Sequence, residues 1–149
     1  MVVQRSVFNK YQGYNEVNGQ RVPLADSELE QAIINSALFS ELNYDFSTIE
    51  LVGTSSVDDQ KAYEIKITDN KTEYYSIESG LKIKEVEMQE IEGNQLAIET
   101  TIKEYEEVEG ILIPKEINQV TPTLPIPGGI TIKFNNIKLN VKTSDSDFN

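Results

Sequence analysis

The side chains available for chemistry are carboxylates, lysines, serines and tyrosines, because the 149-residue chain contains neither histidine nor cysteine. The missing histidine excludes Ser-His-Asp and Cys-His nucleophilic mechanisms and every histidine metal site. A glycosidase needs two carboxyl groups across a cleft, but 25 acidic residues offer so many pairs that none is indicated. We therefore expect a protein that is not an enzyme and has no cofactor. A carboxylate-based hydrolase is the catalytic alternative.

Acidic residues gather in two places. Asp145 and Asp147, in Ser-Asp-Ser-Asp-Phe, resemble the start of an alternating calcium loop but lack the central glycine and terminal glutamate of an EF-hand. We interpret them as a polar tail and expect no metal site. Nine glutamates and a single lysine lie between Glu85 and Glu109. They are interpreted as a solvated sheet face with its loops, and a cation or partner site is the alternative.

Composition limits the class of protein and its partners. A net charge of -12 argues against nucleic acid and against anionic lipid surfaces, because both require patches of Lys and Arg. No stretch is long and apolar enough to span a bilayer. The first residues, Met1 to Arg5, lack the apolar segment and cleavage site of a signal peptide. We expect residues 1–149 to form a single domain that needs no disulfide or metal to fold.

One helix is predicted, at residues 27–41. Ser27 and Glu30 have the spacing of a capping box, in which each side chain satisfies a free amide of the first turn. Ile34 and Leu38 lie on the side opposite the main apolar face, and Phe39 flanks them. A helix that is apolar on more than one side is usually buried on more than one side.

In the rest of the chain, apolar and polar residues alternate with a period of two, which predicts strands. Four turn signals separate runs rich in Ile, Val, Tyr and Leu: Asp69-Asn70, Ser79-Gly80, Gly93-Asn94 and Glu109-Gly110. The predicted strands are 2–8, 48–53, 61–68, 71–78, 81–91, 95–107, 111–120 and 130–142, and Asn18-Gly19 could close a further small hairpin. Within 81–91, 95–107 and 130–142 the apolar residues change between odd and even positions, which predicts a bulge in each strand. In the last of these, Asn135-Asn136 could instead be a turn. Several bulges in long strands predict strong curvature.

A family resemblance rests on two groups of residues. The first is Tyr105-Glu-Glu-Val-Glu-Gly-Ile-Leu-Ile-Pro114, followed by Ile137-Lys-Leu-Asn140 and Asp145-Ser-Asp-Phe148; the second is Ala62-Tyr-Glu-Ile-Lys-Ile67, followed by Glu73-Tyr-Tyr-Ser-Ile-Glu-Ser-Gly-Leu81. These segments resemble the outer-membrane lipoprotein-sorting superfamily of Gram-negative bacteria, which includes lipoprotein carriers. They are similar in particular to versions appended to periplasmic, insulinase-like zinc peptidase chains.

The resemblance implies a fold and a compartment. The fold is mainly β (α+β): a strongly curved antiparallel sheet, an incomplete β-barrel of about seven to eight strands, with one helix packed on its concave side. The implied location is the periplasm or the outer membrane, and the chain would be the C-terminal part of a longer native chain. Zinc peptidase activity needs an H-x-x-E-H motif. Any such activity would therefore lie outside this histidine-free chain.

Three functions stay open at this point. The first is a non-catalytic envelope domain that shelters an acyl chain or another apolar group in a groove between sheet and helix, with a lipid, a lipoprotein or the rest of a larger envelope protein as partner. Its candidate ligand-binding residues are Ile34, Leu38, Phe39, Tyr63 and Tyr75. The second is a structural or interaction module of a larger periplasmic peptidase-like protein, with no ligand of its own. The third is the carboxylate hydrolase.

Overall fold

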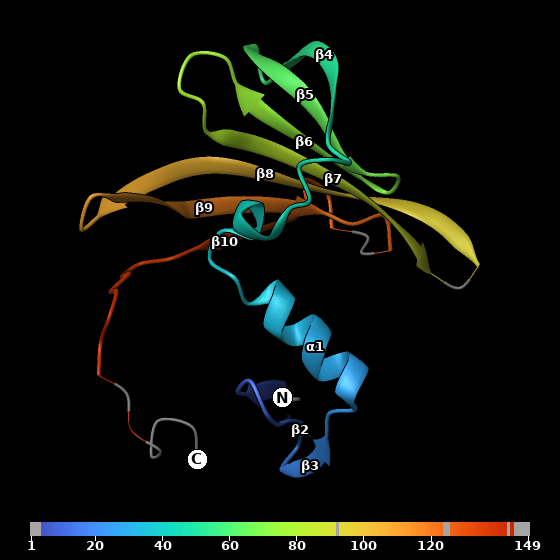
Figure 1. The fold of residues 1–149 in the computed structure, drawn as a ribbon, viewed down its shortest axis with the longest axis vertical. Helices are drawn as coiled ribbons and strands as arrows, with labels where there is room; N and C mark the ends of the chain where they lie inside the picture. The colour runs from blue at the N-terminus through green and yellow to red at the C-terminus, as the bar shows by residue number, and fades with distance from the viewer. Residues whose placement is uncertain (1–3, 92, 124–125, 143, 145–149) are drawn as a thin grey trace. The chain divides into compact units, whose positions relative to one another are not determined.

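The computed structural model describes residues 4–91, 93–123, 126–142 and 144, and the chain divides into two compact units (Figure 1). The N-terminal unit comprises the described residues of Met1–Tyr44 and Lys142–Asn149, and the sheet unit comprises those of Asp45–Val141. That residues 1–149 act as a single domain stays a prediction.

A three-stranded antiparallel sheet opens the N-terminal unit, with strand order β1-β2-β3. The strands are β1 (Gln4–Phe8), β2 (Gly13–Val17) and β3 (Gln20–Pro23). Asn18 and Gly19 join the last two with φ angles of 50° and 81°. Asn and Gly tolerate positive φ, which the tight turns of hairpins require, so the small hairpin predicted at Asn18-Gly19 is confirmed.

The helix is shorter than predicted. Helix α1 spans Asp26–Asn35, and a separate 3-10 turn, η1, spans Ser40–Asn43. The capping box predicted at Ser27 and Glu30 is wrong, because Glu28 accepts the hydrogen bond of the Ala25 amide at 2.7 Å. At the other end, the Ser36 hydroxyl donates to the Ile33 carbonyl at 2.8 Å. Such a side-chain bond competes with helix continuation, and Leu38 and Phe39 consequently lie beyond the helix.

Seven antiparallel strands form the sheet unit, in the order β10-β9-β8-β7-β6-β5-β4 (Figure 1). Their bounds are β4 Glu50–Val57, β5 Gln60–Thr68, β6 Lys71–Ser76, β7 Lys82–Ile91, β8 Asn94–Val108, β9 Ile111–Val120 and β10 Ile130–Lys133. The predicted turns at Asp69-Asn70, Ser79-Gly80 and Glu109-Gly110 separate strands as expected, whereas Asn94 already begins β8. Among the described residues, no helix is both long and apolar enough to cross a membrane.

The predicted architecture is therefore right in class and wrong in detail. The chain is mainly β, but its ten described strands form two sheets instead of one sheet of seven or eight. The edge strands β4 and β10 are not paired with each other, so the larger sheet does not close into a barrel. Its curvature also differs from the strongly curved sheet that was predicted. The sequence analysis predicted the strand 2–8 and the Asn18-Gly19 hairpin but not that they form a separate sheet. Strands β2 and β3 are short and lie in a polar, turn-rich segment, and they pair only with strands adjacent in sequence. Packing of the helix on the larger sheet stays a prediction.

Two of the three predicted bulges are present. Tyr74 pairs with Lys84 and Tyr75 with Lys82, so Ile83 is an extra residue in β7. In β8, the pairing steps from Ile102 to Glu104 past Lys103. Each extra residue reverses the parity of the positions that follow, which explains why the apolar alternation changes phase at these points.

The third bulge was predicted within a long strand over 130–142, and that strand is wrong. Strand β10 ends at Lys133, and the last bond toward β9 runs from the Phe134 amide to the Lys115 carbonyl at 2.9 Å. Asn135 and Asn136 follow the end of the strand as irregular chain and form neither a bulge nor a hairpin turn.

Gly129 sets the start of β10. Gly128 and Gly129 have φ angles of 80° and 78°, but a Cβ on Gly129 would overlap the Gln119 carbonyl oxygen, whereas one on Gly128 would meet nothing within 4 Å. We expect Gly128→Ala to cost about 1 kcal/mol of unfolding free energy, the usual left-handed strain, and Gly129→Ala to cost about 2–4 kcal/mol through strain plus the clash. Urea unfolding of both variants measures the difference. Equal losses of unfolding free energy would contradict the close contact between Gly129 and the Gln119 carbonyl of β9.

Candidate functional site

A cavity of about 1040 Å³ lies within the N-terminal unit. Pockets for small ligands usually measure roughly 300–1,000 Å³ and are mostly apolar with a few polar groups. The apolar and aromatic lining is Val7, Phe8, Tyr11, Tyr14, Pro23, Leu24 and Leu29, and the polar lining is Asn9, Gln12, Arg21 and Asp26, with Gly13 between them. Size and lining therefore suit an organic molecule with a large apolar part.

Strand pairing positions one wall of the cavity. Tyr14 pairs with Val7 on one side and with Pro23 on the other, and directly paired residues project from the same face of a sheet. The Leu24 amide donates to the Gly13 carbonyl at 2.9 Å, which holds the chain after β3 against β2. Leu29, the buried apolar residue of α1, completes the apolar lining.

A side-chain turn shapes the rim. The Asn9 side-chain oxygen accepts hydrogen bonds from the amides of Tyr11 and Gln12 at 2.8 and 3.0 Å. This is an Asx turn, which fixes a connection without long-range contacts. It presents Tyr11 at the cavity with 77% of its surface exposed. The Lys10 ammonium lies 4.7 Å from the centre of the Tyr11 ring.

Three charged residues line up across the small sheet. Glu16 pairs with Arg5 of β1 and Arg21 of β3, and its Oε2 lies 3.4 Å from the Arg5 Nη2 and 2.7 Å from the Arg21 Nε. The hydrogen bond from Arg21, aided by the charge of Arg5, lowers the pKa of Glu16, and the same bond raises the pKa of Arg21. The Arg21 guanidinium also lies 4.6 Å from the centre of the Tyr14 ring, a cation–π distance.

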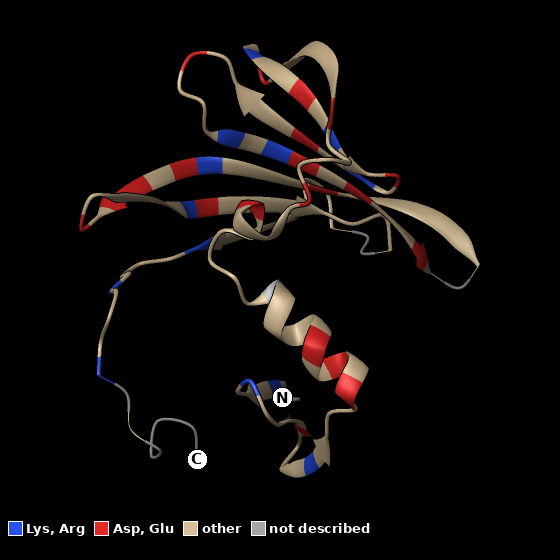
Figure 2. Ribbon diagram, viewed as in Figure 1, with Lys and Arg blue, Asp and Glu red and all other residues tan. Residues whose placement is uncertain are grey.

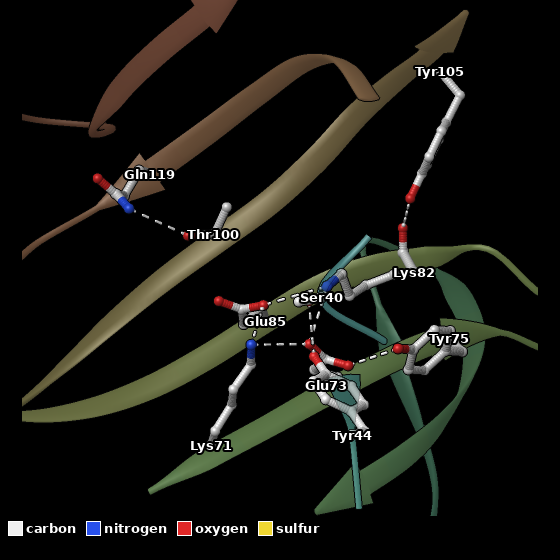
Figure 3. A network of polar contacts seen from close by, with 10 residues as sticks. All are labelled: Ser40, Tyr44, Lys71, Glu73, Tyr75, Lys82, Glu85, Thr100, Tyr105 and Gln119. Atoms are coloured by element: carbon white, nitrogen blue, oxygen red, sulfur yellow. Dashed lines mark hydrogen bonds and ion pairs between the residues drawn. The ribbon is translucent and has the colours of Figure 1, made fainter. Parts of the chain in front are cut away.

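The sheet unit contains a second polar arrangement, an ionic network centred on Glu73 (Figure 3). Glu73 is fully buried. Its Oε1 lies 3.0 Å from the Lys82 Nζ and 3.2 Å from the Lys71 Nζ, and its Oε2 accepts the Tyr75 hydroxyl at 2.6 Å. Both lysines also reach Glu85, at 3.1 Å from Lys71 and 3.4 Å from Lys82. Two carboxylates and two ammonium groups therefore balance each other.

The network belongs to a row of paired residues that crosses the whole sheet. Directly paired positions run through Leu51, Ile65, Glu73, Glu85, Thr100, Gln119 and Ile130. The four inner members are polar and the outer members are apolar, and Gln119 donates to the Thr100 hydroxyl at 3.4 Å (Figure 3). A buried carboxylate is tolerated only when it is paired and hydrogen-bonded. The network is thus a satisfied structural core element, and its carboxylates are engaged by lysines.

On the opposite face of the sheet, one row of paired residues is polar and contains a tyrosine with a shifted pKa. Glu64, Tyr74 and Lys84 pair across β5, β6 and β7. Burial, reinforced by the charge of Glu64, raises the pKa of the Tyr74 hydroxyl. Charges of both signs mark the strands of this sheet, and the first turn of α1 is acidic through Asp26 and Glu28 (Figure 2).

No group of three metal-ligating side chains is present among the described residues. Asp145 and Asp147 lie outside the described residues.

The sequence-predicted ligand residues fall into two groups. Tyr63 and Tyr75 pair directly in the sheet unit, and the Tyr75 hydroxyl joins the Glu73 network. Ile34 lies in the last turn of α1, and Leu38 and Phe39 follow it, all in the N-terminal unit. None of the five lines the cavity. A groove that joins both groups stays a prediction.

Sequence reasoning missed the cavity because residues 9–25 were read as a polar, turn-rich connection. A usable signal was present: Tyr11 and Tyr14 precede the Asn18-Gly19 turn, and Val22-Pro-Leu24 follows it. Apolar and aromatic residues on both sides of a hairpin turn can form one face of a small sheet.

Comparisons with known proteins inform the fold. No family model matches the sequence, and no curated protein matches it. Among solved structures, the chain is similar to a DUF1329 family protein from Desulfovibrio piger ATCC 29098, with a TM-score of 0.57 and 15% identity. The match covers 93% of this chain but only 62% of that protein. The comparison shows a shared fold. The resemblance to lipoprotein-sorting proteins, and the closer relation to chains attached to zinc peptidases, stay predictions.

Proposed function

We propose that this chain is a non-catalytic binding domain of the bacterial cell envelope that shelters an acyl chain or another apolar group. The observation that carries the proposal is the cavity of about 1040 Å³ with its apolar and aromatic lining. The groove anticipated from the sequence was to lie between the helix and the larger sheet. The proposed site instead uses the small sheet and the start of α1.

The compartment and the mode of action follow from the resemblance. The sequence resemblance to lipoprotein-sorting proteins, carried by residues 62–81 and 105–148, is the reason to propose the periplasm or the outer membrane as the location. Catalysis is not part of the proposal, because a shelter for an apolar group acts through shape and needs no acid, base or nucleophile.

Exposed Tyr11 provides the test. Tyr11 and Phe46 expose 77% and 76% of their surfaces, but only Tyr11 lines the cavity. We expect the uncharged fluorescent probe N-phenyl-1-naphthylamine to bind the protein, and Tyr11→Ala to weaken binding about tenfold, because burying an aromatic side chain contributes roughly 1.5–3 kcal/mol. Fluorescence titration gives both dissociation constants.

The matched control is Phe46→Ala, which should leave probe affinity within about twofold. Circular dichroism should show the same fold for all three proteins, since both substituted side chains are exposed. Absence of probe binding to the unsubstituted chain, or equal weakening by the two substitutions, would refute the proposed site.

A second function is favoured by the Glu73 network. A row of satisfied polar side chains through the middle of the larger sheet suits a surface filled by its own residues. This supports the structural or interaction module of a larger envelope protein as the alternative. In that case the probe would not bind, while the sheet unit would retain the stability that its ionic core provides.

A further inference from the structure

The chain has two arginines in its whole sequence, Arg5 and Arg21, and they lie on either side of one glutamate. Both guanidinium groups contact the same Oε2 atom of Glu16. Arginine is the side chain best suited to carboxylate and phosphate groups, because its planar fork presents several donors to an anion. Its concentration at one place in a chain of net charge -12 needs a local explanation.

Charge balance at this place differs from that of the Glu73 network. Two guanidinium groups face one carboxylate in the small sheet, whereas two ammonium groups face two carboxylates around Glu73. The ionic row of the small sheet therefore keeps one excess positive charge. Lys10 beside Tyr11 adds a second, and Asp26 at the start of α1 opposes it.

The geometry of Arg21 leaves donors directed away from Glu16. Among the described residues, Arg21 donates to Glu16 through Nε alone, and its two terminal nitrogens donate to no other protein group. The side chain is half exposed, lines the cavity and is held over the Tyr14 ring at 4.6 Å. A fixed cation at an apolar cavity is suited to bind a molecule that has an anionic end and an apolar body.

We propose that the cavity of the N-terminal unit binds an amphiphilic anion, with a carboxylate or phosphate group on Arg21 and the apolar body against Val7, Tyr14 and Leu29. This rests on the proposed function, since it names the ligand class of the same cavity. A purely apolar ligand would gain nothing from Arg21, because it carries no charge that the guanidinium could attract. An anionic end would gain a charge-assisted hydrogen bond.

Competition against N-phenyl-1-naphthylamine tests the proposal. Dodecanoate and dodecanol have the same chain length and differ in charge. We expect dodecanoate to displace the probe about tenfold more effectively, since a hydrogen bond to a charged group is worth about 1.5–3 kcal/mol. In Arg21→Gln that preference should fall to about onefold, and Arg21→Lys should restore part of it.

Lys103→Gln is the matched control. Lys103 is exposed to a similar degree, 44% against 50% for Arg21, and its ion pair with Asp58 has the same 2.7 Å length as that between Arg21 and Glu16. It should leave the preference for dodecanoate unchanged. Vesicles of phosphatidylglycerol separate the possible sources of the anion. Sedimentation of the protein with vesicles that depends on Arg21 assigns a lipid head group, whereas displacement by dodecanoate without sedimentation assigns a free acid.

Two further outcomes overturn different claims. If dodecanol and dodecanoate compete equally and Arg21→Gln changes neither, the anionic ligand class is wrong while the apolar cavity stands. If the probe does not bind at all and neither compound changes the thermal unfolding of the chain, the proposed function fails together with this inference.

Discussion

Replacement of Glu73 by Gln is expected to lower the free energy of unfolding of the sheet unit by about 3 kcal/mol. Removing one partner of a buried ion pair usually costs about 3–5 kcal/mol, because the remaining charge stays buried without compensation. Here the loss should lie at the low end, since Glu85 still faces both Lys71 and Lys82. Urea unfolding followed by circular dichroism measures it.

Glu99→Gln is the control for charge removal as such. Glu99 forms one cross-strand ion pair, with Lys84 at 2.6 Å, and its side chain is 45% exposed, whereas that of Glu73 is fully buried. Exposed pairs contribute about 0–1 kcal/mol. Equal losses in the two variants would show that the Glu73 network is not a buried ionic core.

A quadruple substitution separates charge from packing at the same site. We expect Glu73→Leu combined with Lys71→Met, Lys82→Met and Glu85→Gln to recover most of the stability lost in Glu73→Gln, because no charge of the network is then left without a partner. Apolar residues of similar volume often replace a buried ionic group without loss. A quadruple variant less stable than Glu73→Gln would assign the network a role in holding the register of β6 and β7 that apolar packing cannot supply.

Ile113→Ala should have an effect of similar size. Ile113 in β9 exposes only 4% of its surface and is one of the few apolar side chains buried in the sheet unit. Truncation of a buried isoleucine to alanine costs about 2–5 kcal/mol through lost transfer free energy and the cavity that is left. The same urea experiment gives the value.

Ile111→Ala is the comparison two residues earlier on the same strand, where the side chain is 39% exposed. We expect a loss of less than about 1 kcal/mol there, because much of the isoleucine surface already meets water. A loss equal to that of Ile113→Ala would mean that the two positions contribute alike and that β9 has no buried apolar anchor.

Turns and alternation were the most reliable guides to the fold. Asn18-Gly19 and Glu109-Gly110 both adopt the positive φ angles of tight turns, which Asn and Gly favour and Glu109 adopts beside Gly110. The bulges at Ile83 and Lys103 lie where the apolar parity switches. The errors concern elements whose limits depend on a partner. The 130–142 strand ends with the bond from the Phe134 amide to the Lys115 carbonyl, and the helix ends where Ser36 bonds to Ile33.

The candidate site was harder to foresee than the fold. Tyr63 and Tyr75 were predicted as two of five residues that line one groove; they pair directly in the sheet unit, and the groove itself stays a prediction. The buried Glu73 gave no sign in the sequence, because its neighbours alternate no differently from those of an exposed glutamate. The ion pair of Glu73 with Lys82 joins β6 to β7, so its existence depends on a register that is set by the Ser79-Gly80 turn and the Ile83 bulge together.

The sequence by itself determined the β class, the position of most turns and the exclusion of histidine chemistry, because turn conformation and alternation depend on residues adjacent in the chain. Only the tertiary structure decided that the strands form two sheets, that Glu73 is buried among lysines, and that Arg5 and Arg21 meet at Glu16 beside a cavity. The physical reason is that burial and ion pairing depend on which residues face each other across strands. A shift of one position in register would send the same side chains to the opposite face.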